Sequence, residues 1–209
     1  MLLSLIKQII GSVATVSTTG QEDIDIQYLL TDSRQLGKDP QHTLFFAIQT
    51  AKNDGSKYIP DLQAQGVQAF VTGDAIAALQ TLATYVREQF TGTVIGITGS
   101  NGKTVVKEWL YQLLKDDYAI IRSPKSYNSQ IGVPLSVWQL SSVYDAQCTM
   151  HNEKKTLAIF EAGISEPGEM ERLEPMIRPT IGVITYIGPE HGENFQSIEQ
   201  KRAEKMKLF

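Results

Sequence analysis

The sequence has little of several features that mark common classes of protein. It contains one cysteine, Cys148, so no internal disulfide can form, and its three histidines are too scattered to make a zinc-type cluster. Lysine and arginine total 19 against 23 acidic residues, for a formal charge of −4, which leaves no basic surplus for general nucleic-acid binding. Lys7 and Gln8 interrupt the apolar start before it reaches the length of a signal-peptide core. We therefore expect a cytoplasmic protein with no nucleic-acid partner and no membrane insertion.

The length of 209 residues exceeds that of a usual single domain, roughly 100 to 150 residues, so we expect two domains or one domain and a part of another. Short strand-like runs at 24–30, 43–48 and 67–72 are separated by turns and indicate a mixed α/β domain over residues 1–91. From residue 92 on, apolar strands alternate with helices, which predicts an α/β domain with a mostly parallel sheet. The chain ends inside an apparent helix, so we expect this second domain, 92–209, to be incomplete.

A glycine-rich turn joins the apolar strand at 94–98 to a helix at 104–115. Glycines in this turn allow backbone N–H groups to converge on phosphate oxygens, Lys103 can reach the outer phosphates, and the Thr104 hydroxyl can bind Mg²⁺. The standard phosphate-loop pattern would place a glycine at Ile97, so the loop is a variant. The predicted nucleotide-binding residues are Gly99, Ser100, Asn101, Gly102, Lys103 and Thr104. The alternative is an ordinary turn with an incidental lysine. The apolar positions predicted to face the core from the helix are Val106, Trp109, Leu110, Leu113 and Leu114.

Polar residues that follow apolar strands are further candidates, because open parallel sheets bind ligands beyond the carboxyl ends of their strands. Glu161 ends the run 157–160, and His191 lies six residues past Thr185. A carboxylate is a hard oxygen ligand that suits Mg²⁺, whereas imidazole is a less usual one. A helix-capping glutamate and a surface histidine remain open alternatives. Lys205, taken alone, is typical of a solvated helix lysine.

Taken together, these motifs resemble the Mur ligases of peptidoglycan synthesis, which are ATP-dependent amide-forming enzymes. Residues 98–104 (TGSNGKT) are similar to the family's variant phosphate loop, and residues 31–34 (TDSR), 44–47 (LFFA) and 54–55 (DG) to its uridine-nucleotide-binding N-terminal domain. The stretches that favour the ligase adding D-alanyl-D-alanine are 106–108, 128–135, 161–163, 167–170 and 184–191. The sequence departs from the family pattern at Tyr186 and Ser56, where asparagine and histidine are usual.

The resemblance implies the reaction and the residues that carry it. ATP would activate the peptide carboxylate of UDP-N-acetylmuramoyl-tripeptide to an acyl phosphate, which the amine of D-alanyl-D-alanine then attacks. The implied catalytic residues are Lys103, Glu161, His191 and Lys205. The implied Mg²⁺ ligands are Thr104, Glu161, His191 and Lys205, the last as a carbamate. The implied substrate-binding residues are Ser33, Arg34, Phe46, Asp54 and Asn128. Family members also have a third, C-terminal domain that closes over the site, so we expect the 209 residues alone to be inactive.

Two other interpretations stay open. One is a different ATP-dependent ligase of the same superfamily, either the diamino-acid-adding ligase or a folylpolyglutamate synthase, although residues 32–34 and 128–135 argue against both. The other is a UDP-sugar-binding fragment without catalytic activity. A turnover assay separates these interpretations.

Overall fold

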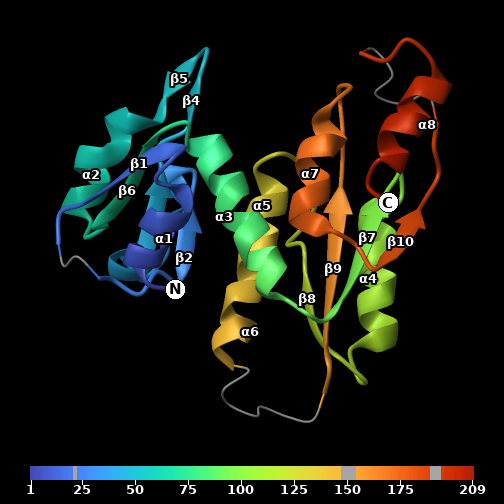
Figure 1. The fold of residues 1–209 in the computed structure, drawn as a ribbon, viewed down its shortest axis with the longest axis horizontal. Helices are drawn as coiled ribbons and strands as arrows, with labels where there is room; N and C mark the ends of the chain where they lie inside the picture. Colours follow the sequence, from blue (N-terminus) through green and yellow to red (C-terminus); the bar gives the residue numbers. More distant parts are fainter. Residues whose placement is uncertain (21–22, 147–153, 189–193) are drawn as a thin grey trace. The chain divides into compact units, whose positions relative to one another are not determined.

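The computed structural model describes residues 1–20, 23–146, 154–188 and 194–209 (Figure 1). The chain divides into two compact units, Met1–Tyr85 and Val86–Phe209. The division falls within helix α3 (Ala75–Gln89). Among the described residues, no helix combines the length and the apolar character that crossing a membrane requires.

The first unit is built on a four-stranded sheet in the order β1-β6-β3-β2. Its strands are β1 (Ala14–Thr18), β2 (Tyr28–Leu30), β3 (Thr43–Phe46) and β6 (Ala69–Gly73). β2, β3 and β6 run parallel, whereas β1 pairs antiparallel with β6. A short hairpin forms from β4 (Gln49–Thr50) and β5 (Asn53–Asp54). The predicted mixed α/β character is therefore present.

Helices and apolar side chains complete the first unit. Its helices, besides most of α3, are α1 (Leu3–Ile10), α2 (Ile59–Ala64), and the 3-10 turns η1 (Ser33–Gln35), η2 (Pro40–His42) and η3 (Gly55–Tyr58). In α1, Leu3, Ile6 and Ile10 are fully buried, as their helical spacing on one face requires. A core cluster forms around Phe45, Phe70 and Leu62, and Leu36 after η1 and Tyr58 of η3 pack against it.

The second unit contains a wholly parallel four-stranded sheet in the order β10-β7-β9-β8. Its strands are β7 (Thr93–Thr98), β8 (Ala119–Arg122), β9 (Thr156–Ala162) and β10 (Ile181–Ile184). Its helices are α4 (Lys103–Leu114), α5 (Gly132–Val137), η4 (Trp138–Leu140), α6 (Ser141–Ala146), α7 (Glu169–Ile177) and α8 (Ile198–Met206). The alternation of strand and helix confirms the predicted α/β class with a mostly parallel sheet.

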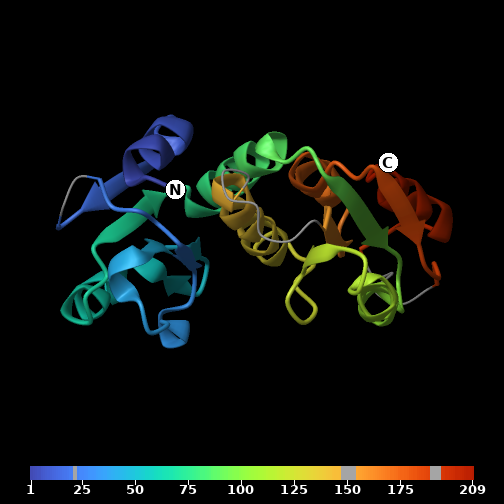
Figure 2. The same ribbon diagram turned by 90° about the horizontal axis from the view of Figure 1, so that it is seen from below.

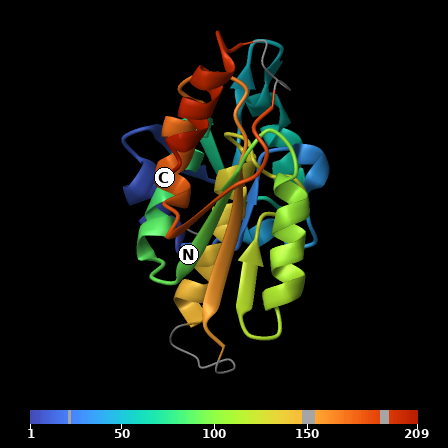
Figure 3. The same cartoon turned by 90° about the vertical axis from the view of Figure 1, so that its right-hand side faces the viewer.

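Helices cover both faces of this sheet, with α4 on one face and α7 on the other (Figures 2 and 3). On the α4 face, Ile95 and Ile97 of β7 pack with Leu157 and Ile159 of β9. On the opposite face, a side chain at Gly96 would lie 2.9 Å from Pro179, so glycine lets the segment after α7 pack closely. The two central strands are therefore buried on both sides, and their carboxyl ends are fixed relative to each other.

The predicted core face of α4 is only partly right. Val106, Leu110 and Leu114 pack against the sheet, as predicted. Trp109 and Leu113 do not, since they are 62% and 75% exposed. The helix carries two neighbouring apolar stripes, and only one of them faces the strands.

Candidate nucleotide-binding site

The glycine turn after β7 has the backbone geometry that its sequence predicts. Gly99 and Gly102 both have positive φ angles, 146° and 81°, a region that side chains disfavour. A Cβ at Gly99 would also lie 1.9 Å from Thr185 Oγ1, so only glycine fits there. Gly102 occupies the N-cap position of α4, which directs the first N–H groups of the helix into the turn. The turn can therefore receive an anion.

The segment after β10 supports this turn. Ser100 N donates to Tyr186 O at 2.7 Å, and Ser100 Oγ donates to Gly188 O at 3.2 Å. Thr185 Oγ1 donates to Asn101 O at 2.5 Å. Tyr186 contacts the loop through its main chain and is 61% exposed, so these contacts do not need the asparagine that is usual in the family.

Lys103 folds back over the turn instead of extending into solvent. Its Nζ donates to Gly99 O at 2.8 Å and to Ser100 O at 3.2 Å. Burial lowers the pKa of Lys103, the Glu161 carboxylate opposes that change, and nearby Lys201 reinforces it. The ammonium therefore lies at the turn with only backbone carbonyls as its hydrogen-bond partners among the described residues.

Thr104 and Glu161 meet directly, although they are far apart in sequence. Thr104 Oγ1 donates to Glu161 Oε2 at 3.0 Å. Glu161 is fully buried in β9, paired in register with Ile97 of β7. Its Oε1 accepts no hydrogen bond among the described residues, although the Lys107 ammonium forms an ion pair with it at 2.9 Å. A buried carboxylate oxygen with free acceptor capacity beside a hydroxyl fits a hard divalent cation such as Mg²⁺.

A pocket of about 240 Å³ opens beside the turn. Its lining residues are Gly99, Ser100, Lys103, Asn128, Ser129, Gly163, Ile164, Ser165, Glu169, Lys201 and Lys205. The lining is strongly cationic, because three lysines face one carboxylate. Such a pocket favours phosphate or carboxylate groups.

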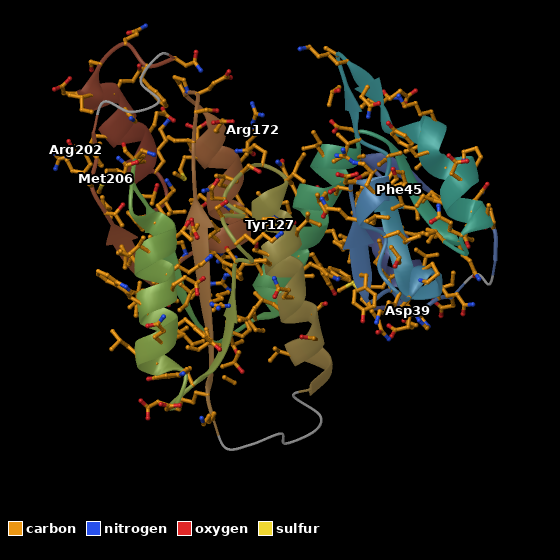
Figure 4. The ribbon with its side chains drawn as sticks, turned by 180° about the vertical axis from the view of Figure 1, so that it is seen from behind. Asp39, Phe45, Tyr127, Arg172, Arg202 and Met206 are labelled. Carbon is orange, nitrogen blue, oxygen red and sulfur yellow. The ribbon has the colours of Figure 1, made fainter. Side chains whose placement is uncertain are left out.

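Two of these lysines come from α8, whose outward side carries Arg202 and Met206 (Figure 4). Lys201 and Lys205 are each only 2% exposed. Lys205 Nζ donates to Gly99 O at 3.2 Å, and Lys201 Nζ donates to Gly188 O at 2.7 Å. Burial lowers the pKa of Lys205 to about 8, and the neighbouring charges of Lys103 and Lys201 add to this effect. Lys205 is therefore not the solvated lysine that its sequence context alone suggests.

Asn128 reaches the pocket through the loop between β8 and α5. Its main-chain carbonyl accepts a hydrogen bond from Gly163 N at 2.8 Å. A Cβ at Gly163 would lie 2.9 Å from both Cγ and Oδ1 of Asn128, so the glycine after β9 allows the side chain to pack closely. The structure thus brings Asn128 to the same pocket as Lys103 and Lys205.

The predicted substrate-binding residues of the first unit lie on and beside its 3-10 turns. Ser33 and Arg34 are in η1, where Arg34 forms a bidentate pair with Asp32 at 2.9 and 2.7 Å. Asp54 caps η3 by accepting from Ser56 N at 2.9 Å, and the Ser56 hydroxyl and backbone hold the pKa of this carboxyl below its usual range. Phe46 is fully buried in β3, so its side chain belongs to the core.

One predicted residue, His191, lies outside the described residues. Within the described part of the chain, no group of three or more histidine, cysteine, aspartate or glutamate side chains gathers as a metal site. Sequence reasoning did not single out Lys107 or Lys201. Lys201 lies four residues before Lys205, and this helical spacing places both on one face, which is the signal that could have identified it.

Comparisons with known proteins point to one family. The model of the Mur ligase middle domain matches residues 97–209, and that of the Mur ligase family catalytic domain matches residues 25–118. The UDP-N-acetylmuramoyl-tripeptide–D-alanyl-D-alanine ligase of Borreliella burgdorferi is 31% identical over 208 residues, covering 88% of this chain and 42% of that protein. The ligase of the same name from Synechocystis is 32% identical over 190 residues, covering 83% of this chain and 39% of that protein.

Solved structures show the same fold. MurF from Acinetobacter baumannii superposes with a TM-score of 0.79 at 23% identity, covering 98% of this chain and 45% of that chain. MurF ligase from Thermotoga maritima, in complex with ADP, superposes with a TM-score of 0.71 at 25% identity, covering 87% of this chain and 42% of that chain. This chain therefore spans less than half the length of the relatives it matches here.

Proposed function

The chain belongs to the Mur ligase family, and from this premise we propose that it forms the substrate-binding and nucleotide-binding parts of a MurF-type ligase. The reaction is the ATP-dependent addition of D-alanyl-D-alanine to UDP-N-acetylmuramoyl-tripeptide. The observation that carries the proposal is the convergence of Lys103, Thr104 and Glu161 at the carboxyl ends of β7 and β9. The names of the curated relatives supply the two substrates.

The two parts of the chain would bind different substrates. Residues 1–91 bind the uridine nucleotide, with Ser33, Arg34 and Asp54 on the turns η1 and η3. Residues 92–209 bind ATP at the glycine turn. The ADP bound by the Thermotoga maritima relative supports a nucleotide in this second part.

ATP phosphates would replace the backbone carbonyls that now accept from Lys103. Gly99 O and Ser100 O are neutral acceptors, whereas phosphate oxygens carry charge and make stronger bonds with an ammonium. The backbone N–H groups of the turn and the N-terminus of α4 complete the phosphate cradle. Lys103 then neutralises charge that develops on the transferred phosphoryl group.

Thr104 and Glu161 are the residues that would hold Mg²⁺, with His191 as a further ligand. A bound Mg²⁺ would neutralise phosphate charge and orient the terminal phosphoryl group. Glu161 Oε2 and Thr104 Oγ1 already lie within 3.0 Å of each other, so their oxygens can serve one cation without a change in the strands.

Lys205 would act as a carbamate. Its neutral amine nitrogen adds to the carbon of CO₂ and releases one proton, which gives an anion in place of a cation. Burial and the neighbouring lysines favour the neutral amine, since they lower the pKa of Lys205 to about 8. The product is a carboxylate-like group that Lys103 and Lys201 can neutralise.

The chemistry would proceed in two displacements. A carboxylate oxygen of the tripeptide attacks the γ-phosphorus of ATP, the bond from that phosphorus to the bridging oxygen breaks, and ADP leaves. The amine nitrogen of D-alanyl-D-alanine then attacks the acyl carbon, inorganic phosphate leaves with the carboxylate oxygen, and the nitrogen loses a proton. The chain's contribution is positioning and charge neutralisation by Lys103 and the lysines of α8.

The test is ADP and phosphate release by the complete native protein, measured with both substrates and with each omitted. We expect release only with both, and we expect Lys103→Met to reduce it by about 10²-fold or more, as for the loss of other transition-state donors. Lys115→Met, at an exposed lysine that ends the same helix, is the control and should retain activity. Release that continues without the tripeptide substrate, or that is unaffected by Lys103→Met, would show that the proposal is wrong.

A further inference from the structure

Lys107 is a fully buried lysine that the reaction described above does not use. It follows Thr104 by three residues on α4, so the two side chains lie on the same side of the helix. Its exposed fraction is 0%, which is rare for lysine unless a specific partner neutralises it. Its surroundings therefore indicate what it does.

The Lys107 ammonium contacts Glu161 and two backbone carbonyls. It forms an ion pair with Glu161 Oε1 at 2.9 Å, and both side chains of this pair are fully buried. Its Nζ donates to Ser123 O at 2.8 Å and also to Lys125 O. A longer ion pair reaches Glu108 Oε1 at 3.4 Å. The ammonium is thus held from several directions, and Glu161 is the fully buried carboxylate among its partners.

The energetics of burial make Lys107 and Glu161 depend on each other. Removing one partner of a buried ion pair leaves an uncompensated charge, which costs more than removing both partners. Because Thr104 binds Glu161 Oε2 and Lys107 binds Oε1, the carboxylate is fixed at both oxygens. The two contacts therefore orient the carboxylate between Thr104 and Lys107 of α4.

The second set of contacts links Lys107 to the loop of Asn128. Lys125 has a φ of 49°, in the left-handed region that non-glycine residues disfavour, and its carbonyl is turned to the ammonium. Tyr127 N donates to Pro124 O at 3.0 Å and closes this turn immediately before Asn128. The ammonium therefore stabilises a disfavoured backbone conformation at the start of the pocket wall.

We propose that Lys107 is a positioning residue that fixes the Glu161 carboxylate against Thr104 and joins it to the turn that carries Asn128. The inference deepens the proposed function and rests on it, since the carboxylate matters as the expected Mg²⁺ ligand. Lys107 is not among the residues that line the pocket, so it would act through Glu161. Groups that orient metal ligands typically change metal affinity by about 10- to 100-fold when they are removed.

The experiment measures ADP affinity by calorimetry, with Mg²⁺ and with a chelator, on the complete native protein. The variants are Lys107→Met, Glu161→Gln, the double variant, and Lys115→Met as the exposed-lysine control. We expect Lys107→Met to lose about tenfold or more of the affinity that Mg²⁺ adds. Its ADP affinity without Mg²⁺ should stay within about twofold of the wild-type value, because the phosphate loop is intact.

The double variant separates positioning from a general structural role. If Lys107 acts through Glu161, the gain in ADP affinity that Mg²⁺ gives the double variant should lie within about twofold of the gain in Glu161→Gln alone. The reason is that the effects of two coupled substitutions are not additive. If Lys107→Met alone does not fold, a folded double variant that matches Glu161→Gln supports the inference, because the unpaired charge is then the cause. Circular dichroism reports folding in each case.

Three results would overturn the inference. The first is a Lys107→Met variant whose ADP affinity rises with Mg²⁺ as much as that of the wild type, and the second is a double variant in which the losses of the two single variants add. The third is failure of both Lys107 variants to fold. A wild-type protein that binds no ADP under either condition contradicts the proposed function as well. If Mg²⁺ raises the ADP affinity of the wild type and of Lys107→Met equally, the role of Lys107 is contradicted and the proposed function is not.

Discussion

Replacing Lys205 with methionine should make the folded protein more stable while it removes activity. The folded structure lowers the pKa of Lys205 from 10.5 to about 8, because the ammonium is buried near Lys103 and Lys201. At roughly 1.4 kcal/mol for each pH unit of difference, protonated Lys205 destabilises the folded state by about 3 kcal/mol at pH 7. Methionine fills a similar volume without a charge, so Lys205→Met should raise the free energy of unfolding by about that amount.

The hydrogen bond that Lys205→Met removes leaves no acceptor without a partner. Gly99 O accepts from Lys205 Nζ at 3.2 Å and also from Lys103 Nζ at 2.8 Å. The stronger of these two bonds remains in the variant. The loss therefore offsets little of the gain in stability.

The stability difference should depend on pH with a defined sign. Between pH 8 and pH 10.5 the unfolded chain binds more protons at Lys205 than the folded chain does, so wild-type stability rises with pH across this window. Lys205→Met lacks this rise. Its free energy of unfolding should therefore exceed that of the wild type by about 3 kcal/mol at pH 7 and by less than about 1 kcal/mol at pH 10.

Urea denaturation followed by circular dichroism, in CO₂-depleted buffer at both pH values, measures the difference between wild type and Lys205→Met. CO₂ depletion keeps wild-type Lys205 as an amine, so the comparison reports the ammonium alone. Two results would refute the reasoning: a variant less stable than wild type at pH 7, or a difference that is the same at both pH values.

Three other substitutions test separate parts of the structure. Lys103→Ala should abolish turnover while calorimetry shows nearly unchanged affinity for the UDP-tripeptide, and an equal loss of affinity would contradict two separate binding regions. Lys205→Ala should lose most activity and regain part of it with added short-chain carboxylates, whereas Lys207→Ala, at the exposed residue directly after α8, should be nearly silent in the same assay. Arg87→Met should lower the free energy of unfolding by about 2–4 kcal/mol in urea, because the buried guanidinium donates to three backbone carbonyls at 2.6–2.9 Å. A change below about 0.5 kcal/mol would mean that these bonds contribute nothing measurable.

The parts of the fold that could be predicted from the sequence are those set by local pattern. The phosphate turn was predictable because its two glycines, Lys103 and Thr104 all lie within the segment 99–104, between an apolar strand and a helix. The position of Glu161 followed from parallel topology, since strand ends meet at one edge of a sheet. Neither inference requires knowledge of how distant segments pack.

The face of α4 could not be predicted in the same way. Residues 105, 109 and 113 form one apolar stripe at i, i+4 spacing, and residues 106, 110 and 114 form another beside it. Both fit a helical period equally well. The structure places residues 106, 110 and 114 against β7 and β9, whereas Val105, Trp109 and Leu113 are 50%, 62% and 75% exposed.

Lys107 and Lys201 escaped prediction because lysine is ordinarily a surface residue, whereas Lys205 was identified only through the family resemblance. Lys107, Lys201 and Lys205 are at most 2% exposed, which no compositional rule anticipates. Local rules are expected to fail where function requires an arrangement that costs stability. Two buried lysines, Lys201 and Lys205, line one pocket beside Lys103, and this arrangement is itself an indication of an anionic ligand.

The backbone explains how the fold holds so many cations in one place. The carbonyls that accept from the four lysines of the site follow the carboxyl ends of three parallel strands: Gly99 and Ser100 after β7, Ser123 and Lys125 after β8, and Gly188 after β10. The carboxyl ends of all strands in a parallel sheet lie at the same edge, so the topology alone brings these carbonyls close together. They satisfy each ammonium while the pocket is open, yet they are neutral and bind less strongly than phosphate oxygens. The edge of the sheet can therefore keep Lys103, Lys201 and Lys205 ordered and still allow them to turn to a phosphate, as the proposed nucleotide site requires, while Lys107 stays with Glu161.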